Sequence, residues 1–414
     1  MALTEEERRE LTTIEGQLED ADSDTRRWAV YDLEKYPAED ILDYLITATK
    51  DEHRAVREAA SEVLESVPTA VSISKLTPLL GHARIEVRNL VAALISKFGV
   101  EATPALIKAL KEGNEDERKF SADILGLAHS ELAVDSLATA LYDEVENVGV
   151  SAAEALGKIR SAKALPHLQT AFETKKYLMR ESAEAIGLIG EPEGARYLLG
   201  KLADTTDLLV QYAMIDALGN AGDMHVLEYL EEHIGELPKP LRDAATLSML
   251  KISQRTGTNL LSRAGAPIEA LVAGLEDSSE EYQQLLIDHI DGALDVRVLQ
   301  QLTQARERMN PHVLVALIKA VTDQPGLAEF CLKMVDHADD WVAYSAVEQL
   351  PKLGQKKAAE VIKRVLEGDR NLPQLAAMRV VQELGVEEAL EWVKPFLESD
   401  DEDLRSLAGQ VLDL

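Results

Sequence analysis

Three acidic residues near the start of the chain have the alternate spacing of calcium ligands. Asp20, Asp22 and Asp24 in the run EDADSD match the first positions of a calcium-binding loop. Such a loop needs Gly at its sixth position and a bidentate Glu at its twelfth, where this chain has Thr25 and Tyr31. We therefore expect a loop that caps the following helix. Because HExxH, GxSxG, P-loop and GxGxxG motifs are also missing from the sequence, it predicts no catalytic residue, no metal ligand and no cofactor.

A second group of residues could bind a partner protein. Large polar side chains recur at one position of a repeat of about thirty residues, and one further residue adjoins them. They are Tyr44, Lys75, His167, Arg196, Tyr197 and Tyr229. Tyrosine on a rigid surface offers a large contact area at a low ordering cost, so we predict that this row is partner-binding. The alternative is that its members are half-buried packing residues whose polar ends reach water.

The repeat itself consists of an apolar residue followed by apolar or small residues four and eight positions later. Val56, Ala60 and Leu64 form one such triple, which lies along a single helix face. We call its first residue the opening position. Opening positions fall at residues 25, 56, 87, 117, 148, 178, 210, 241, 282, 313, 342, 372 and 404. The intervals are 29 to 32 residues, apart from one of 41, which indicates a repeat protein.

Each repeat reads as helix A, which holds the triple, then a short turn and helix B. Residues of N-cap type, such as Asn114, Asp207 and Asp339, stand three positions before the opening position. One pair of helices cannot bury both apolar faces, so neighbouring pairs must stack. The sequence predicts an all-α fold, an α-solenoid (superhelix) of about 13 helix-pair repeats. We divide it into 1–24 (N-terminal capping helix), 25–250 (regular repeats), 251–267 (irregular insertion or hinge) and 268–414 (less regular repeats).

Three details of this scheme carry further expectations. The insertion 251–267 is either a longer loop or extra turn, or a hinge or change of curvature between residues 1–250 and 267–414. Cys331 should be a small core residue. Arginines one residue after the opening position should form ion pairs between repeats, with an anion-binding stripe as the alternative. These arginines are Arg26, Arg57, Arg88, Arg118, Arg242 and Arg405.

Charge and composition narrow the classes of partner. The 414 residues carry 43 Lys and Arg against 74 Asp and Glu, a net charge of −31, which disfavours nucleic acid and anionic membranes. The start lacks a signal peptide, no stretch is apolar enough to span a membrane, and a single cysteine fits a reducing compartment. We therefore expect a cytoplasmic protein.

The units that read D..VR..AA.ALG.I resemble the short HEAT-like repeats of phycobilisome lyases. The clearest copies are residues 86–99, 148–159, 178–190 and 403–412. The resemblance implies the α-solenoid and places helix B on its concave face. Proteins with the same repeat include a di-iron deoxyhypusine hydroxylase, whose His-Glu dipeptides bind iron. They also include alkylpurine DNA glycosylases, which bind DNA in a basic groove. None of the nine histidines is followed by Glu, and the net charge argues against such a groove.

The interpretation we favour is a non-enzymatic protein-binding scaffold that uses the concave face of an acidic α-solenoid. The alternative is a bilin lyase-like protein, which would handle a tetrapyrrole and act on a partner protein. The partner is expected to be another protein rather than nucleic acid or a membrane. Apolar residues of the C-terminal helix could also support a homodimer, namely Leu404, Leu407, Val411 and Leu414.

Overall fold

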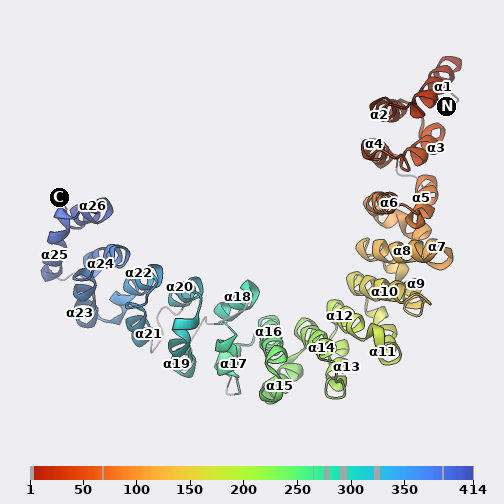
Figure 1. Cartoon of the computed structure of the whole chain (residues 1–414). Helices are drawn as coiled ribbons and strands as arrows, with labels where there is room; N and C mark the ends of the chain where they lie inside the picture. Colours follow the sequence, from red (N-terminus) through yellow and green to blue (C-terminus); the bar gives the residue numbers. More distant parts are fainter. Residues whose placement is uncertain are drawn as a thin grey trace. The chain divides into compact units, whose positions relative to one another are not determined.

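The computed structural model confirms an all-α solenoid of stacked helix pairs (Figure 1). It describes residues 4–67, 70–263, 265–274, 279–289, 296–320, 327–384 and 387–413. Within these ranges every regular element is a helix. The chain divides into two compact units, Met1–Gly222 (unit 1) and Asp223–Leu414 (unit 2). Each of the thirteen opening positions lies in an even-numbered α-helix from α2 to α26 or, at residue 178, directly before one.

The described residues of unit 1 form seven A helices and seven B-type helices. The A helices are α2 (Ser23–Asp32), α4 (Arg54–Glu65), α6 (Ile85–Lys97), α8 (Glu115–Leu127), α10 (Glu146–Ile159), α12 (Met179–Ile189) and α14 (Leu208–Ala221). The B-type helices are α1 (Glu5–Leu18), α3 (Ala38–Ala48), α5 (Ala70–Leu76), α7 (Thr103–Glu112), α9 (Val134–Ala140), α11 (Leu165–Thr174) and α13 (Pro192–Leu202). Helix α1 starts with a capping box, in which Thr4 and Glu7 exchange hydrogen bonds.

Unit 2 continues the same alternation. Its A helices are α16 (Lys239–Thr256), α18 (Glu280–Asp288), α20 (Pro311–Ala320), α22 (Asp340–Glu348), α24 (Asn371–Leu384) and α26 (Glu402–Val411). Its B helices are α15 (Met224–His233), α17 (Ile268–Ala273), α19 (Val296–Ala305), α21 (Leu327–Met334), α23 (Gln355–Leu366) and α25 (Glu387–Val393). Cys331 on α21 is fully buried, as predicted for a core residue.

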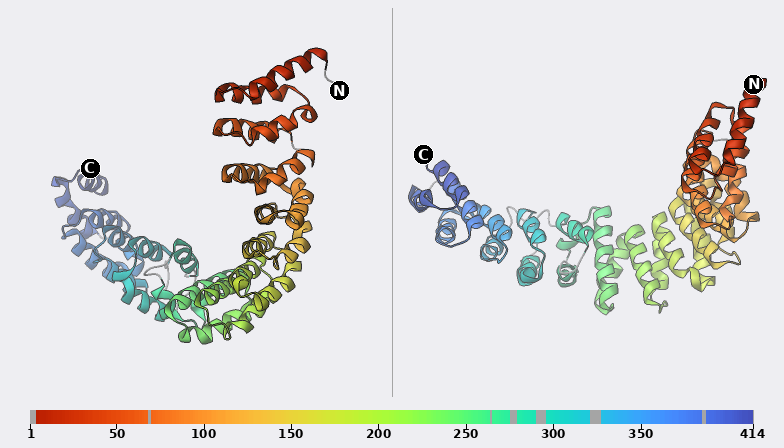
Figure 2. Two further views of the ribbon diagram at one scale, coloured as in Figure 1. Left: turned by 45° about the vertical axis from the view of Figure 1, so that its right-hand side comes forward. Right: turned by 45° about the horizontal axis from the view of Figure 1, so that its top comes forward.

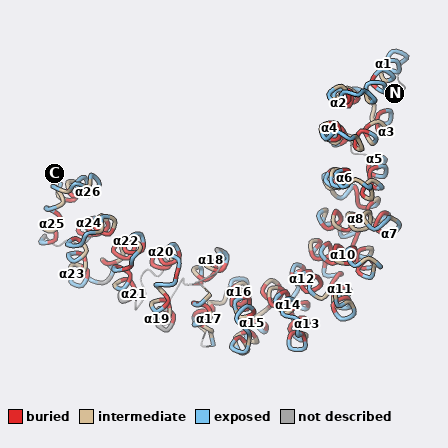
Figure 3. Tube along the Cα trace, viewed as in Figure 1, coloured by how far each residue is buried: buried red, intermediate tan, exposed pale blue. Residues whose placement is uncertain are grey.

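The apolar triples form the core of each unit. Val148, Ala152 and Leu156 of α10 are all 0% exposed, and the equivalent triples of α4, α6 and α12 are also buried. Figure 3 shows buried residues on the facing sides of helices and exposed residues on their outer sides. Stacking neighbouring A helices therefore removes the repeated row from water, which is the main stabilising contribution of this fold.

The A helices of unit 1 approach one another closely at glycines nine residues after the opening position. A Cβ added at Gly157 would lie 2.8 Å from the Cα of Ala185 on α12. Added Cβ atoms at Gly126 and Gly187 would similarly lie 2.7 Å and 2.6 Å from the Cα atoms of alanines on the next A helix. These contacts are shorter than a side chain tolerates, so glycine is required there for the observed packing.

Aspartate and asparagine cap the A helices as the spacing predicts. Asp207 accepts hydrogen bonds from the N–H groups of Leu209 and Val210, and Asn114 accepts one from Glu117. Asp22 does the same for Thr25, so the calcium-like run EDADSD acts as the expected capping loop. These bonds satisfy helix N–H groups that have no partner inside the helix.

The irregular segment 251–267 is built from a longer helix and one short turn. Helix α16 continues through Thr256 and ends at Gly257, whose φ of 68° is in the left-handed region. A 3₁₀ turn, Leu260–Ser262, then buries Leu260 and Leu261. Arg263 pairs with Glu231 of α15 at 2.6 Å. The hinge interpretation of this segment stays a prediction, and the boundary between the two compact units lies upstream of it, after Gly222.

The arginines one residue after the opening position have two kinds of partner. Arg26, Arg88 and Arg118 pair with acids of the following repeat, Asp51, Asp116 and Asp143, as predicted. For Arg57, Arg242 and Arg405 the contacts are instead to main-chain carbonyl groups of the preceding loop. The shared function of this position is therefore to hold the loop carbonyls, and the ion pair between repeats is an addition in three of the six.

Among the described residues, no single helix is long and apolar enough to cross a membrane. Only the helix pair Ile85–Lys97 and Gly99–Glu112 among the described residues has the length and composition of a membrane span, and the two helices are bent by 117° relative to each other. In the C-terminal helix α26, Leu404 and Val411 are buried and Leu407 is half-buried. Leu414, the last residue of the predicted dimer contact, lies outside the described residues.

Candidate protein-binding surface

The predicted partner-binding row lies on B helices, which form the outer side of unit 1. Tyr44 is on α3, Lys75 on α5, His167 on α11, and Arg196 and Tyr197 are on α13. Figures 1 and 2 show that the A helices of unit 1 line the inner side of its curve and the B helices its outer side. The expectation that helix B is concave is therefore wrong for unit 1. Tyr229 is on α15 of unit 2 and is considered separately.

Tyr197 makes the contacts of a packing residue. Its ring meets Phe172 edge-on at 6.0 Å, and Lys201 lies 5.6 Å from its centre. Its hydroxyl donates a hydrogen bond to the carbonyl of Gln169 at 3.1 Å and lies 3.3 Å from Glu173. Burial, together with Glu173, raises the pKa of Tyr197 far above its ordinary value. These contacts match the packing alternative rather than a free binding side chain.

The other members of the row differ in how far they are engaged. Lys75 forms an ion pair with Asp43, and Tyr229 stacks on His233 with ring centres 4.0 Å apart. Burial and the nearby Glu15 raise the pKa of Tyr44, which is half-buried. Lys75, His167 and Arg196 are exposed, whereas Tyr44, Tyr197 and Tyr229 are half-buried.

The A helices of unit 1 carry more exposed large apolar side chains than its B helices do. Among the described residues of unit 1, seven exposed large apolar or aromatic side chains lie on A helices, and one, Val71, lies on a B helix. The seven are Trp28, Ile85, Leu127, Leu188, Leu208, Leu209 and Tyr212. Trp28 is 60% exposed and Tyr212 is 51% exposed. Exposed tryptophan and tyrosine side chains are of the type that contributes strongly to binding in protein interfaces.

A row of acidic residues runs along the same helices, six residues after the opening position. The A helices from α4 to α14 each carry one of these residues, except α6, which has Ala93 at this position. The row comprises Glu62, Asp123, Glu154, Glu184 and Asp216. On α2 the same position is Tyr31, whose hydroxyl donates to Glu62 at 2.6 Å. This row is not among the residues predicted from the sequence, although it is visible there at the sixth residue after each opening position.

Cations on the same helices offset part of this charge. Lys119 lies 2.8 Å from Asp123, Arg180 lies 3.3 Å from Glu184 and Lys158 lies 3.7 Å from Glu154. An acidic excess nevertheless remains around Glu184.

Burial raises the pKa of Glu184, Arg180 opposes this shift, and the carboxylates of Glu181, Glu154 and Asp216 raise the pKa further. Carboxylates on three successive A helices thus act on one another across the inner side. The result is a surface that favours an approaching cation.

No arrangement for catalysis is apparent in the described part of the chain. It contains no group of three or more His, Cys, Asp or Glu side chains suited to a metal ion. Burial raises the pKa of the Cys331 thiol, so this side chain is held in its neutral, unreactive form.

Comparison with known proteins agrees with this fold. The family model described as HEAT repeats matches residues 12–95 and 103–185, both in unit 1. The molecule is thus an all-α solenoid, and two segments of its first half are similar to HEAT repeats. No curated protein matches the sequence.

Several solved structures share the fold at low sequence identity. Importin beta, crystallised in an ammonium sulfate condition, is 12% identical with a TM-score of 0.50, and the match covers 99% of this chain and 69% of importin beta. Kap121p bound to RanGTP is 15% identical with a TM-score of 0.53, covering 99% of this chain and 48% of Kap121p. Kap121p bound to Ste12p gives the same identity and TM-score, with coverage of 99% and 49%. This chain spans about half the length of Kap121p.

Proposed function

We propose that this protein is a non-enzymatic scaffold that binds another protein on the inner side of unit 1. The observation that carries the proposal is the acidic row from Glu62 to Asp216, which is presented by successive A helices beside the exposed Trp28 and Tyr212. Helix stacking does not require these side chains, because the buried triples already provide it. The structures of Kap121p with RanGTP and with Ste12p support the idea that such a solenoid binds proteins.

The chemistry of the surface indicates the kind of partner. A row of carboxylates with exposed aromatic residues fits a basic protein surface that also offers apolar side chains. The net charge of −31 would speed the encounter with such a partner at low salt. We also assign the repeats to the short HEAT-like class of phycobilisome lyases on their period of about 31 residues. None of the comparisons supports the bilin-lyase alternative, so we do not propose it.

The test compares matched variants of the two sides of unit 1. Tagged protein is purified gently from its native cells, and each co-purifying protein is quantified by mass spectrometry. The inner-side variant replaces Glu62, Glu154 and Glu184 with Gln. The outer-side control replaces His167 and Arg196 with Ala. We expect the amount of partner that co-purifies with the inner-side variant to fall at least tenfold, while the amount that co-purifies with the control is unchanged.

Two results would count against the proposal. Loss of the partner only in the outer-side variant would show that the partner binds the predicted row on the B helices. Retention in both variants would place the partner elsewhere on the molecule. Circular dichroism of every variant confirms that helicity is unchanged, so that a loss of binding reports on the surface and not on folding.

A further inference from the structure

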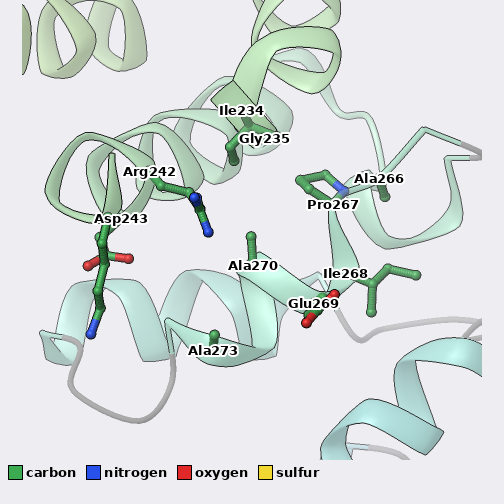
Figure 4. Close-up of a pocket in the computed structure, with 11 residues that line it drawn as sticks. Ile234, Gly235, Arg242, Asp243, Ala266, Pro267, Ile268, Glu269, Ala270 and Ala273 are labelled. Atoms are coloured by element: carbon green, nitrogen blue, oxygen red, sulfur yellow. The ribbon is translucent and has the colours of Figure 1, made fainter. Parts of the chain in front are cut away.

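Unit 2 contains a groove that the function proposed above does not use. It has a volume of about 540 Å³ and lies between the start of α16, the short turn Ile234–Glu236 before it, and α17 (Figure 4). Apolar walls are provided by Ile234, Pro267, Ile268 and Ala270. A groove of this size is within the range of sites that hold small ligands or peptide ends.

The groove is a product of the irregular segment. Pro267 belongs to the stretch 251–267 that lengthens one interval from about 31 to 41 residues, and α17 begins directly after it. The wall formed by α17 thus follows a segment that the regular repeats lack.

Arg242 is the one charged side chain of the groove that is half-buried. It extends from α16 into the space that faces Ala270 of α17 (Figure 4). It donates a hydrogen bond to the carbonyl of Leu237 at 3.0 Å, while its Nε atom is buried without a partner. Within the described residues no carboxylate contacts this guanidinium. The guanidinium is thus a positive charge on the groove wall that no described carboxylate neutralises, so the position favours an anionic acceptor.

The equivalent arginines of unit 1 show which acceptor fits. Arg26 binds both carboxylate oxygens of Asp51 at 2.9 Å, and Arg118 binds both oxygens of Asp143 at 2.8 Å. Arg26 and Arg118 hold a main-chain carbonyl of the preceding loop through Nη1, which leaves Nε and Nη2 for the carboxylate. Arg242 holds its loop carbonyl through Nη2 instead. Two arginines at this register position thus bind a carboxylate in the two-pronged geometry that guanidinium groups prefer, whereas Arg57 contacts main-chain carbonyls.

We propose that the groove binds the C-terminal residue of a partner polypeptide. Its terminal carboxylate would pair with Arg242, and an aliphatic side chain on the same residue would rest against Ile234, Pro267 and Ile268. A chain end is favoured over an acidic side chain because one residue then supplies both the charge and the apolar group. This inference goes beyond the proposed function and does not depend on the inner side of unit 1.

Charges at the rim define the residues that precede the chain end. Asp243 and Glu269 line the groove and are exposed, as is Lys239. Two rim carboxylates against one rim cation disfavour further acids in the ligand and favour a basic residue before the aliphatic one. The ligand is therefore a polypeptide that ends in a basic residue followed by Leu, Ile or Val.

The test uses the full-length protein and a fluorescein-labelled peptide of sequence GSGSKL. Fluorescence anisotropy measures binding of the peptide with a free C-terminal carboxylate and of the same peptide with a C-terminal amide. We expect the acid to bind at least ten times more tightly than the amide. Arg242→Gln should weaken binding of the acid at least tenfold. Ala270→Asp should do the same by giving Arg242 a carboxylate from the chain itself.

The control variant is Lys239→Gln, which changes an exposed rim charge and should weaken binding less than threefold. Equal binding of acid and amide, or no saturable binding of the acid up to about 1 mM, would overturn the proposal. Asp277, at the sequence position equivalent to Asp51 and Asp143, lies outside the described residues. Binding that occurs only in an Asp277→Asn variant would also overturn the proposal, because the groove would then belong to the chain's own loop. None of these assays involves the inner-side variant of unit 1, so the two proposals can fail separately.

Discussion

The contact between Arg26 and Asp51 shows how one residue links two repeats. The side chains are only 9% and 13% exposed, and both carboxylate oxygens accept hydrogen bonds from the guanidinium at 2.9 Å. Asp51 also accepts a bond from the N–H of His53, at the turn before α4. Burial alone would raise the pKa of Asp51, but these hydrogen bonds outweigh it, so the pKa lies below its ordinary value.

Replacing Asp51 with Asn should therefore destabilise unit 1 in a way that depends on pH. Removing one partner of a nearly buried pair costs about 3 kcal/mol at neutral pH. Because the pKa of Asp51 is lowered by folding, its contribution is present above the unfolded-state pKa of about 4 and is lost as the pH falls through the folded-state value. Urea unfolding of the wild type and the variant should show a difference in free energy that shrinks below about pH 4.

The matched control is Glu52→Gln, since Glu52 also lies near Arg26, at 3.7 Å, but its side chain is 88% exposed. A surface charge of this kind should change the free energy of unfolding by less than about 0.5 kcal/mol. If the Asp51→Asn difference stayed constant down to pH 3, the carboxylate charge would not be the stabilising group.

At the scale of the helices, the sequence predicted most of the architecture. The period of about 31 residues located all thirteen A helices, because a buried row at four-residue spacing cannot be mistaken for a strand. Residues of N-cap type such as Asp22 and Asp207 located helix starts for the same local reason. The sequence did not predict the long α16, whose extra turns are held by tertiary burial of Ile252 and Ser253.

Replacing a helical glycine with alanine should lower the stability of the protein at one position, Gly157, and raise it at another, Gly200. Gly157 on α10 meets the backbone of α12, and an added Cβ would lie 2.8 Å from the Cα of Ala185. Pushing α10 and α12 apart should cost about 1 to 3 kcal/mol, more than the helix propensity that alanine adds. Thermal unfolding of Gly157→Ala should therefore occur at lower temperature than in the wild type.

Gly200 on α13 provides the comparison, because no atom lies within 4 Å of an added Cβ. Here Gly→Ala should stabilise the protein by about 0.5 to 1 kcal/mol through helix propensity alone. A gain in stability for both variants would mean that the A helices can separate at little cost. That outcome would contradict the close packing of α10 and α12.

For each unit as a whole, the sequence predicted the layers of the fold but not which layer faces inward. The apolar triples determine what is buried between helices, and both helices of a pair have such a face. Curvature depends on small differences in spacing between the two layers, which no single residue reports. The assignment of Tyr44 and Tyr197 to a concave face therefore came from the resemblance alone, and in unit 1 these residues lie on the outer side.

Stacked repeats contact only their neighbours, so damage to one unit should stay local. Ala152 on α10 and Ala346 on α22 are both fully buried, one in each unit. Replacing either with Glu places an unpaired charge in the A layer, which should cost more than about 3 kcal/mol locally. Hydrogen exchange measured by mass spectrometry should speed up in α8, α10 and α12 for Ala152→Glu, and in α20, α22 and α24 for Ala346→Glu.

The same substitution at Ala93, which is exposed on α6, should leave exchange unchanged, because a surface Glu keeps its hydration. The comparison of exchange rates between the two units tests whether they unfold separately. Faster exchange confined to the substituted unit would show that the two compact units have separate stabilities, as their internal packing implies. Equal acceleration in both units by either variant would show instead that all thirteen repeats unfold as one cooperative body, and the division at Gly222 would then have no energetic meaning.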